Sequence, residues 1–265
     1  MITDPIAVAA ARLREAEETS TPCGPVRDLI GSTDVSTAYA VASVNVALRV
    51  AEGSARIGRK IGLTSEAVQR QLGVDQPDFG SLLSDMVVAD GGTVASGALL
   101  QPKVEGEIAF VLGRDLDGSL ESVESILAAI ESAHAAIEIV DSRIAGWDIT
   151  IADTVADNAS SGLFVLGASA VDVASLVPRD VEMTLTVNGA VQSSGSGRAC
   201  LGDPLLAVLW LARASRDIGD PLRAGEVVLS GALGPMVPVE PGDQVTVNIS
   251  GLGKVAVGFA ERELS

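Results

Sequence analysis

Residues 101–113, with the sequence QPKVEGEIAFVLG, place two glutamates inside a segment that otherwise has the composition of a buried β-strand. A proline turn precedes the segment and a glycine ends it, so the strand is bounded on both sides. Side chains alternate between the two faces of a strand, and we therefore expect Glu105 and Glu107 to share one face. The opposite face, to which Gly106 adds no bulk, is predicted to belong to the core through Val104, Ile108, Phe110 and Leu112.

Two neighbouring carboxylates in an apolar strand repel each other and lose hydration, and a shared proton or a bound cation is the usual remedy. A third carboxylate, Glu138, lies in another apolar run, residues 136–141 (AIEIVD). Three carboxylates suit a hard divalent ion such as Mg²⁺ or Mn²⁺. The alternative is that Glu105 and Glu107 line the solvated face of an edge strand, and spacing alone does not choose between the two.

The composition predicts one large domain, or a domain with a helical annex, for a chain of 265 residues. Hydrophobic residues make up 47% of the chain but aromatic residues only 3%, so we expect a core of branched aliphatic side chains and alanine. The net charge of −17 argues against binding to nucleic acid or to anionic membranes, because both would be repelled. An anionic small substrate would need a local cation.

The expected compartment is the cytoplasm. Cys23 and Cys200 match no metal-ligand spacing and are expected to be reduced thiols. The first residues carry no basic segment of the kind that opens a signal peptide, and no apolar run approaches the roughly 18 residues that span a bilayer.

Hydrophobic periodicity predicts helices at residues 4–20 and 36–53, which form an annex whose apolar faces need the main domain or another subunit. A further helix is expected from Glu66, capped by Thr64 or Ser65. Helices are also predicted at 122–135 and 204–215. The remaining periodic segments are predicted strands, at residues 137–140, 163–166, 181–187, 191–192, 226–229, 244–249 and 255–259, with an Asn188-Gly189 hairpin turn.

Lys60 stands between Gly58 and Gly62 in a short apolar segment, where a charge is unusual, although a surface lysine with a buried stem would look the same. Asp78 lies between proline and phenylalanine, a placement that predicts partial desolvation. The polar residues 153–162 precede an apolar strand and are expected to be a ligand-binding loop. His134 is the only histidine and is expected to be structural, and no Gly-x-Ser-x-Gly elbow is present.

Seven segments in this order resemble the 2-keto-4-pentenoate hydratase group of the fumarylacetoacetate hydrolase superfamily. They are residues 60–65 (KIGLTS), 76–80 (QPDFG), 104–110 (VEGEIAF), 138–143 (EIVDSR), 153–162 (DTVADNASSG), 201–204 (LGDP) and 229–231 (LSG). The resemblance covers nearly the whole chain. It implies an α+β fold, a mixed β-roll with an N-terminal helical region, which we expect at residues 1–70, followed by a catalytic domain at 71–265.

The resemblance also implies the chemistry. Glu105, Glu107 and Glu138 match the family's ligands for a divalent metal, Mg²⁺ or Mn²⁺, and Lys60 and Asp78 match active-site residues. Phe79, Ser160 and Ser161 are the expected substrate-binding residues. The implied reaction adds water to a 2-hydroxy-2,4-dienoate in an aromatic or steroid meta-cleavage pathway. The implied assembly is a homo-oligomer, with decamers known in the group, and association with the aldolase of the next step is compatible with it.

Two other functions stay open. A 2-oxo-hex-3-enedioate (4-oxalocrotonate) decarboxylase of the same superfamily would use the same 2-oxo acid chelate as an electron sink. An inactive paralogue that serves as an assembly subunit would keep the fold and lose the chemistry, but the retained carboxylates, Lys60 and Asp78 argue against it.

Overall fold

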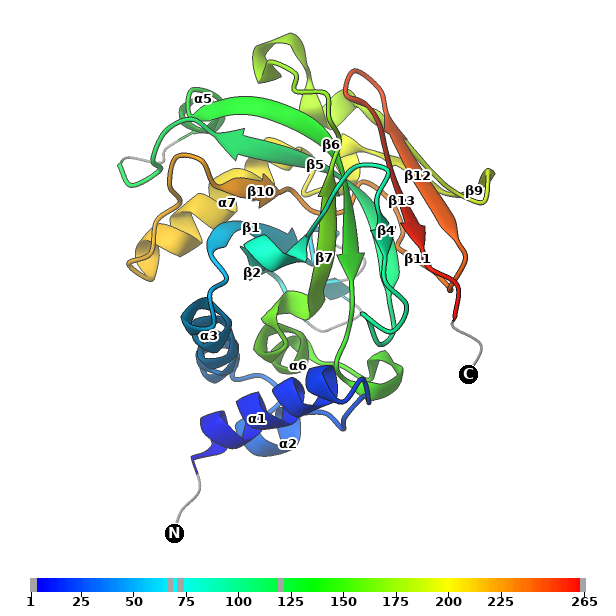
Figure 1. The fold of residues 1–265 in the computed structure, drawn as a ribbon. Coiled ribbons are helices and arrows are strands. Elements are labelled where there is room, and N and C mark those ends of the chain that lie inside the picture. The colour runs from blue at the N-terminus through cyan, green and yellow to red at the C-terminus, as the bar shows by residue number, and fades with distance from the viewer. Residues whose placement is uncertain (1–3, 66–68, 71–73, 119–121, 263–265) are drawn as a thin grey trace.

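Two β-sheets and a set of N-terminal helices make up the fold of the computed structural model, which describes residues 4–65, 69–70, 74–118 and 122–262 (Figure 1). The helices are α1 (Pro5–Glu18), α2 (Arg27–Ile30), α3 (Val35–Ala51), α5 (Val123–Leu127), α6 (Ile151–Ala156) and α7 (Pro204–Asp217). The strands in the first half are β1 (Arg56–Gly62), β2 (Asp78–Leu83), β3 (Val87–Val88), β4 (Thr93–Val94), β5 (Lys103–Leu112) and β6 (Ile130–Val140). Those in the second half are β7 (Ser161–Leu166), β8 (Glu182–Val187), β9 (Ala190–Ser196), β10 (Val227–Leu229), β11 (Val237–Pro238), β12 (Gln244–Ile249) and β13 (Gly253–Phe259).

The larger sheet has eight strands, seven of them in the order β2-β1-β10-β5-β6-β7-β3, and β11 pairs with β5 beside β10. It mixes parallel pairs, such as β1 with β10, and antiparallel pairs, such as β5 with β6. The smaller sheet has five strands in the order β4-β13-β12-β8-β9. The expected α+β class is confirmed.

The long strand β5 separates a packing face from a polar face, as its alternation predicts. Val104, Ile108, Phe110 and Leu112 are fully buried in the main apolar cluster. A Cβ added at Gly106 would come within 3.0 Å of side-chain atoms of Met183 and Val247, on the smaller sheet. The absence of a side chain at Gly106 therefore lets the smaller sheet pack closely on the back of β5.

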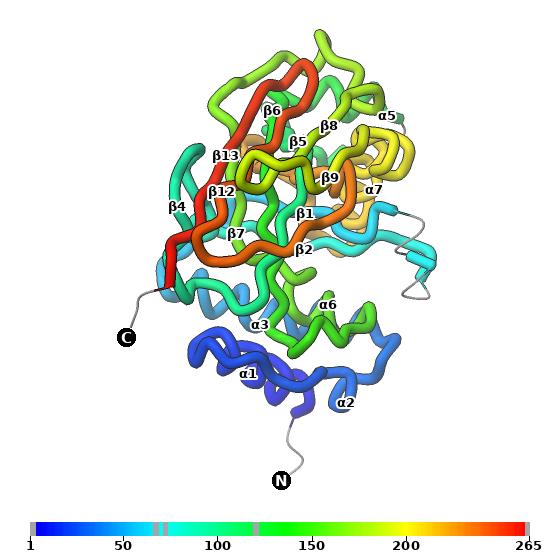
Figure 2. The backbone as a smooth tube through the Cα atoms, turned by 90° about the vertical axis from the view of Figure 1, so that its right-hand side faces the viewer, coloured from blue at the N-terminus to red at the C-terminus, as the bar shows by residue number. Residues whose placement is uncertain are grey.

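The N-terminal helices pack most of their apolar side chains within the chain, although Leu48 and Val50 of α3 are exposed. Leu13 of α1 and Val41 of α3 share a buried cluster with Ile151 and Val155 of α6. Figures 1 and 2 show these helices together at one end of the large sheet. Asp34 begins α3 by accepting a hydrogen bond from the Thr37 backbone, as an N-cap should. The annex was expected to pack on the main domain or on another subunit, and within this chain it packs on the main domain.

The helix predicted at residues 122–135 is wrong in its second half. Helix α5 ends at Leu127, and residues 130–140 form β6, which pairs with β5 on one side and with β7 on the other. The alanines of this segment favour helix as isolated residues. Pairing with β5 along the whole segment, pairing with β7 from Ala136 onward, and burial of the alanines override that preference. His134 therefore lies in the sheet, where its ring contacts the Ser132 hydroxyl and the Gly167 carbonyl.

Most of the other predicted helices and strands agree with the structure within a residue or two, whereas β9 continues to Ser196, beyond the strand predicted at 191–192. The Asn188-Gly189 turn joins β8 to β9 with both residues at positive φ, 52° and 79°, which a two-residue hairpin requires. The segment 153–162, expected to be a loop, instead contains most of α6. The helix expected from Glu66 begins outside the described residues. The division at residue 70 stays a prediction, although β1 already belongs to the large sheet.

No helix within the described ranges is both long enough and apolar enough to cross a membrane.

Candidate active site

The three glutamates singled out in the sequence come together on one face of the large sheet. Glu105 of β5 lies directly opposite Glu138 of β6 in the antiparallel register, and Glu107 is two residues further along β5. One carboxylate oxygen from each of the three lies within 4.8 Å of the others. The exposed fractions of Glu107 and Glu138 are 0% and 1%, whereas Glu105 is partly exposed. The cluster is thus closed on the protein side and accessible at Glu105.

Burial makes this arrangement of charges costly. Desolvation, followed by the neighbouring Glu138 carboxylate, raises the pKa of Glu105 to about 7. The same two causes raise the pKa of Glu107 well above its ordinary value. Glu107 Oε1 and Glu138 Oε2 accept no hydrogen bond, while Glu107 Oε2 accepts one of 2.8 Å from the Gly231 backbone. Buried acceptors without donors are uncommon and mark a place where a cation or ligand is expected.

Lys60 is the cation that the chain itself brings to this cluster. Its Nζ lies 3.0 Å from Glu138 Oε1, and only 3% of the residue is exposed. Burial acts to lower the pKa of Lys60, but the carboxylates of Glu138 and Asp78 outweigh it and hold that pKa above its ordinary value. A buried lysine paired in this way remains a charged ammonium group.

Asp78 faces Lys60 across two glycines. In the antiparallel pair of β1 and β2, Gly62 lies opposite Asp78 and Lys60 lies opposite Gly80. A Cβ added at Gly62 would come within 2.2 Å of Asp78 Oδ1 and 3.5 Å of Lys60 Nζ. The missing side chain at Gly62 therefore makes room for the Asp78 carboxyl group next to the lysine.

The Asp78 carboxyl group is buried and incompletely hydrogen-bonded. The residue is 2% exposed, and its Oδ1 accepts no hydrogen bond. Desolvation raises the pKa of Asp78 to about 6, against the lowering effect of Lys60. A carboxyl group with an unused oxygen beside an ammonium group has the composition of a proton-transfer pair.

Gly58, on the other side of Lys60, lacks space for a side chain for a different reason. A Cβ at this position would lie 2.0 Å from the Val227 carbonyl oxygen, because β1 and β10 run side by side there. The two glycines around Lys60 thus serve separate purposes, one for the strand pairing and one for Asp78.

Comparison with known proteins agrees with this geometry. The sequence profile described as "Fumarylacetoacetate (FAA) hydrolase C-terminal" matches residues 43–259. The chain belongs to the fumarylacetoacetate hydrolase family.

Relatives place it more narrowly within that family. It is 54% identical to "TodF product hydratase" of Pseudomonas putida strain F1, over 98% of this chain and 97% of that protein. It is 52% identical to "2-keto-4-pentenoate hydratase 2" of Dechloromonas aromatica strain RCB, over 95% and 96%. These relatives belong to the 2-keto-4-pentenoate hydratase group of the family. The chain is a hydro-lyase of the same group.

A solved structure extends the comparison to three dimensions. The 4-oxalocrotonate decarboxylase of Pseudomonas putida G7, complexed with magnesium and adipate, superimposes with a TM-score of 0.91 and 33% sequence identity. The superposition covers 96% of this chain and 97% of that one. The fold of this family member is thus shared with the decarboxylase, whereas the sequence is closer to the hydratases.

The three predicted substrate-binding residues already have protein partners. The Ser160 hydroxyl contacts the Thr154 hydroxyl at 3.2 Å, and the Ser161 hydroxyl donates to the Asn158 carbonyl at 2.7 Å. Phe79 follows Asp78 on β2, so its ring projects from the other face of the strand, against Trp210 of α7. Substrate contact by Phe79, Ser160 and Ser161 stays a prediction.

Asn158 is a residue of this region that sequence analysis did not single out. Its side-chain oxygen accepts from the Ser81 backbone at 2.8 Å, and its side-chain nitrogen donates to the Ser81 carbonyl at 2.9 Å. These two bonds replace the strand that β2 lacks on its open edge. A Cβ at Gly80 would lie 2.3 Å from the Asn158 carbonyl oxygen, so Gly80 allows this close approach.

The backbone at Asn158 is unusual. Asn158, Ala159 and Ser160 all have positive φ, at 54°, 53° and 52°. Asparagine tolerates this region, but each alanine or serine there costs of order 1–3 kcal/mol, which surrounding contacts must offset. The only advance signal was asparagine in the run DNAS, which is too common to predict three consecutive left-handed residues.

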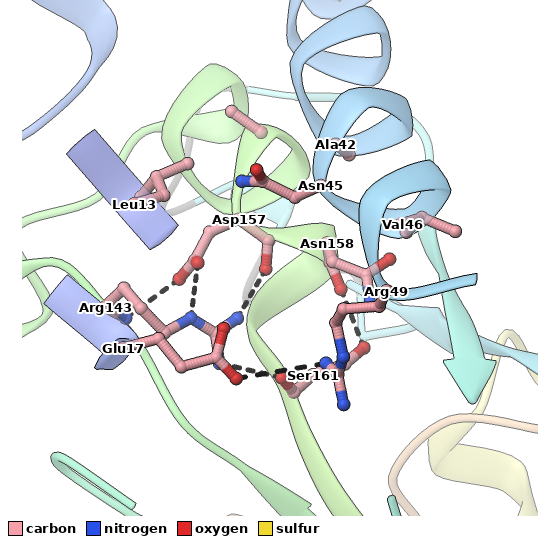
Figure 3. Close-up of a pocket in the computed structure, with 11 residues that line it drawn as sticks. Leu13, Glu17, Ala42, Asn45, Val46, Arg49, Arg143, Asp157, Asn158 and Ser161 are labelled. Atoms are coloured by element: carbon pink, nitrogen blue, oxygen red, sulfur yellow. Dashed lines mark hydrogen bonds and ion pairs between the residues drawn. The ribbon is translucent and has the colours of Figure 1, made fainter. Parts of the chain in front are cut away.

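A buried ion pair holds the turn from behind. Arg143 Nε lies 2.5 Å from Asp157 Oδ1, and the same guanidinium donates to the Ser161 carbonyl at 2.8 Å. Figure 3 shows this pair in a pocket lined also by Leu13 of α1 and Asn45 of α3. None of the three clustered glutamates lines that pocket. Arg143 is thus engaged in supporting the turn.

We predict that Asn158→Ala lowers the free energy of unfolding by about 2 kcal/mol, because two hydrogen bonds to Ser81 are lost and a left-handed residue loses its tolerance. Urea unfolding monitored by circular dichroism measures this change. Asn188→Ala also replaces a left-handed asparagine that makes two side-chain hydrogen bonds, but it lies in the distant β8–β9 turn and is the control for a comparable loss of stability away from the site. The prediction also requires activity to fall in Asn158→Ala and not in Asn188→Ala; equal activity in both variants contradicts a link between the turn and the site.

Proposed function

We propose that this enzyme adds water to 2-hydroxypenta-2,4-dienoate or a short alkyl homologue and releases a 4-hydroxy-2-oxoalkanoate, in the meta-cleavage catabolism of aromatic or steroid rings. The observation that carries the proposal is the buried cluster of Glu105, Glu107 and Glu138 facing the Lys60–Asp78 pair, in a chain whose relatives are hydratases. A 2-hydroxydienoate has a carboxylate and an enol oxygen at one end, and both need positive charge nearby.

A divalent ion, Mg²⁺ or Mn²⁺, fits the three glutamates. Their oxygens are acceptors only, two of them have no donor, and burial opposes ionisation of Glu105 and Glu107 unless a cation is near. The decarboxylase with the same fold is itself complexed with magnesium. When bound, such an ion supplies positive charge to the carboxylate and 2-oxygen of the substrate, which favours the 2-oxo form and its enolate.

Lys60 and Asp78 are the proposed proton-transfer residues. The dienol first loses its 2-hydroxyl proton and gains a proton at C5, which gives a 2-oxo-3-enoate. Hydroxide from water then adds at C4 and a proton adds at C3, so that one water is consumed. The unpartnered Asp78 Oδ1 suits removal of the proton from water, and the Lys60 ammonium group suits stabilisation of the enolate oxygen and return of a proton.

The distal part of the substrate meets an apolar surface under this proposal. The face of the sheet that carries the glutamates continues into a second apolar cluster, which contains Leu82, Ala136, Phe164 and Leu229. This surface suits a vinyl or short alkyl tail.

Neither Arg143 nor Arg198 is free to pair with a second carboxylate at the far end of the substrate. Arg143 is bound to Asp157, and Arg198 is exposed and paired with Asp180. Lys103 Nζ lies 4.1 Å from the centre of the Trp147 ring, and its charge acts on Glu105, at the end of the site where the glutamates cluster. These contacts favour the hydratase over a decarboxylase that accepts a dicarboxylate.

An inactive assembly subunit is the alternative from another class. In a chain without catalytic activity, no function would offset the desolvation cost of burying three glutamates, a lysine and an aspartate. Assembly as a homo-oligomer, and association with the aldolase that consumes the product, belong to the proposal but rest on the family resemblance.

We predict that a chelator abolishes hydration and that Mg²⁺ or Mn²⁺ restores it. In Glu107→Gln the metal no longer restores activity, because a neutral amide removes one of three anionic ligands. Dienoate consumption in the ultraviolet and Mn²⁺ binding by calorimetry measure the two effects. Glu131→Gln, at an exposed position on β6, is the matched control. Full activity in the chelated enzyme contradicts the metal requirement.

We predict that Lys60→Met and Asp78→Asn each lower kcat by at least about a hundredfold, the low end of the effect of general acid–base groups. The melting temperature should change little when the metal is bound, since the glutamates then keep a cation. Lys254→Met and Asp85→Asn remove the same charges outside the site and should keep kcat within about threefold. Unfolding of both Lys60→Met and Asp78→Asn would instead assign these residues to stability.

We predict that 2-hydroxyhexa-2,4-dienoate is turned over with a kcat/KM at least about tenfold above that of the dicarboxylate with the same carbon chain, a difference of about 1.4 kcal/mol. The two substrates differ only in a terminal methyl or carboxylate group, and the carboxylate must lose hydration without gaining a cation. Steady-state kinetics together with a CO₂ assay make the comparison. Preferred decarboxylation of the dicarboxylate would assign the enzyme to the other reaction.

A further inference from the structure

Tyr39, the only tyrosine of the chain, reaches the active site from the N-terminal helices. It lies on α3, and its hydroxyl oxygen accepts a hydrogen bond of 3.2 Å from the backbone nitrogen of Phe79. Its ring stacks on the Phe79 ring, with centroids 4.5 Å apart and an angle of 23° between the planes. Both contacts are made to the residue that directly follows Asp78, at the start of β2.

The hydroxyl hydrogen of Tyr39 is left for another partner. Among the hydrogen bonds of the described residues, this hydroxyl accepts one from Phe79 and donates none. Asp78 Oδ1 is buried and accepts none. Burial and then the negative charge of Asp78 raise the pKa of Tyr39, so the phenol stays protonated.

The close neighbours of the Asp78 carboxyl group come from β1, namely the Gly62 backbone and the Lys60 ammonium group. The backbone nitrogen of the next residue, Phe79, holds the Tyr39 hydroxyl. A phenol at this place can orient the carboxyl group, or the water next to it, without contributing a charge of its own.

We propose that Tyr39 is a positioning residue for Asp78, which makes helix α3 part of the active site and not only a cover for the sheet. The proposal rests on the proton-transfer role of Asp78 stated under the proposed function. The ring fixes the start of β2 by stacking on Phe79, and the hydroxyl group fixes the orientation in which the Asp78 carboxyl group meets water.

The first experiment uses the fact that a single tyrosine gives a single signal. The Mg²⁺-loaded full-length protein is labelled with ¹³C at the Cζ atom of tyrosine, and its spectrum is recorded for the wild type, Asp78→Asn and Asp85→Asn. We expect Asp78→Asn to shift the signal by more than its line width. Asp85→Asn, which removes the partner of Arg49 on the same helix, should not. An unchanged signal in Asp78→Asn overturns the proposal, whether or not the protein is a hydratase.

The second experiment separates the hydroxyl group from the ring. We expect Tyr39→Phe to lower kcat by about tenfold to a hundredfold, the range that one hydrogen bond to a charged group supplies, while KM and the melting temperature change little. Tyr39→Leu should lower kcat to a similar extent and also lower the melting temperature, because the stacking on Phe79 is lost.

The outcomes are distinguishable. Wild-type kcat in Tyr39→Phe overturns the proposal and leaves Tyr39 a purely structural residue. A wild-type enzyme that turns over no dienoate refutes the proposed function, and the labelled spectra then decide alone whether Tyr39 and Asp78 interact.

Discussion

The mutual repulsion of buried carboxylates is the constraint on which the rest of the structure depends. Glu105, Glu107 and Glu138 can occupy neighbouring positions only because a rigid pair of central strands holds them there and because Lys60 offsets part of their charge. Removing one partner of a buried ion pair typically costs about 3–5 kcal/mol, because a buried charge is left without a counter-charge. The cluster therefore does not stabilise the fold, and its presence is explained by function. Packing and pairing of the surrounding strands offset the cost of burying these carboxylates.

Sequence patterns were sufficient wherever one residue's environment is set by its own strand. Alternation placed Glu105 and Glu107 on one face of β5 and the apolar residues on the other, and glycines marked Lys60 as unusual. The family resemblance joined the segments into one site. It did so for residues from four strands, β1, β2, β5 and β6, which no local pattern could bring together.

The errors came from positions where distant contacts decide. The alanines of 133–136 have helical propensity, and pairing with β5, joined at Ala136 by β7, makes them a strand. The left-handed run at Asn158 is stable because Ser81, remote in sequence, accepts and donates its hydrogen bonds. Tyr39 lies in the helix predicted at residues 36–53, but its contact with Phe79 depends on how α3 packs against β2. In each case the missing information is tertiary.

The pairing of β1 with β10 has a consequence for how this chain acquires its fold. Gly58 and Val227 are neighbours in the sheet although most of the sequence separates them, so the strand that carries Lys60 has to wait for β10 during synthesis. Contacts of such long range slow folding, and until they form the edge of β1 remains open to other chains. The active site is therefore among the last parts of the molecule to be completed: a nascent chain that lacks the final forty residues has every catalytic side chain but lacks β10, the strand that joins β1 to β5.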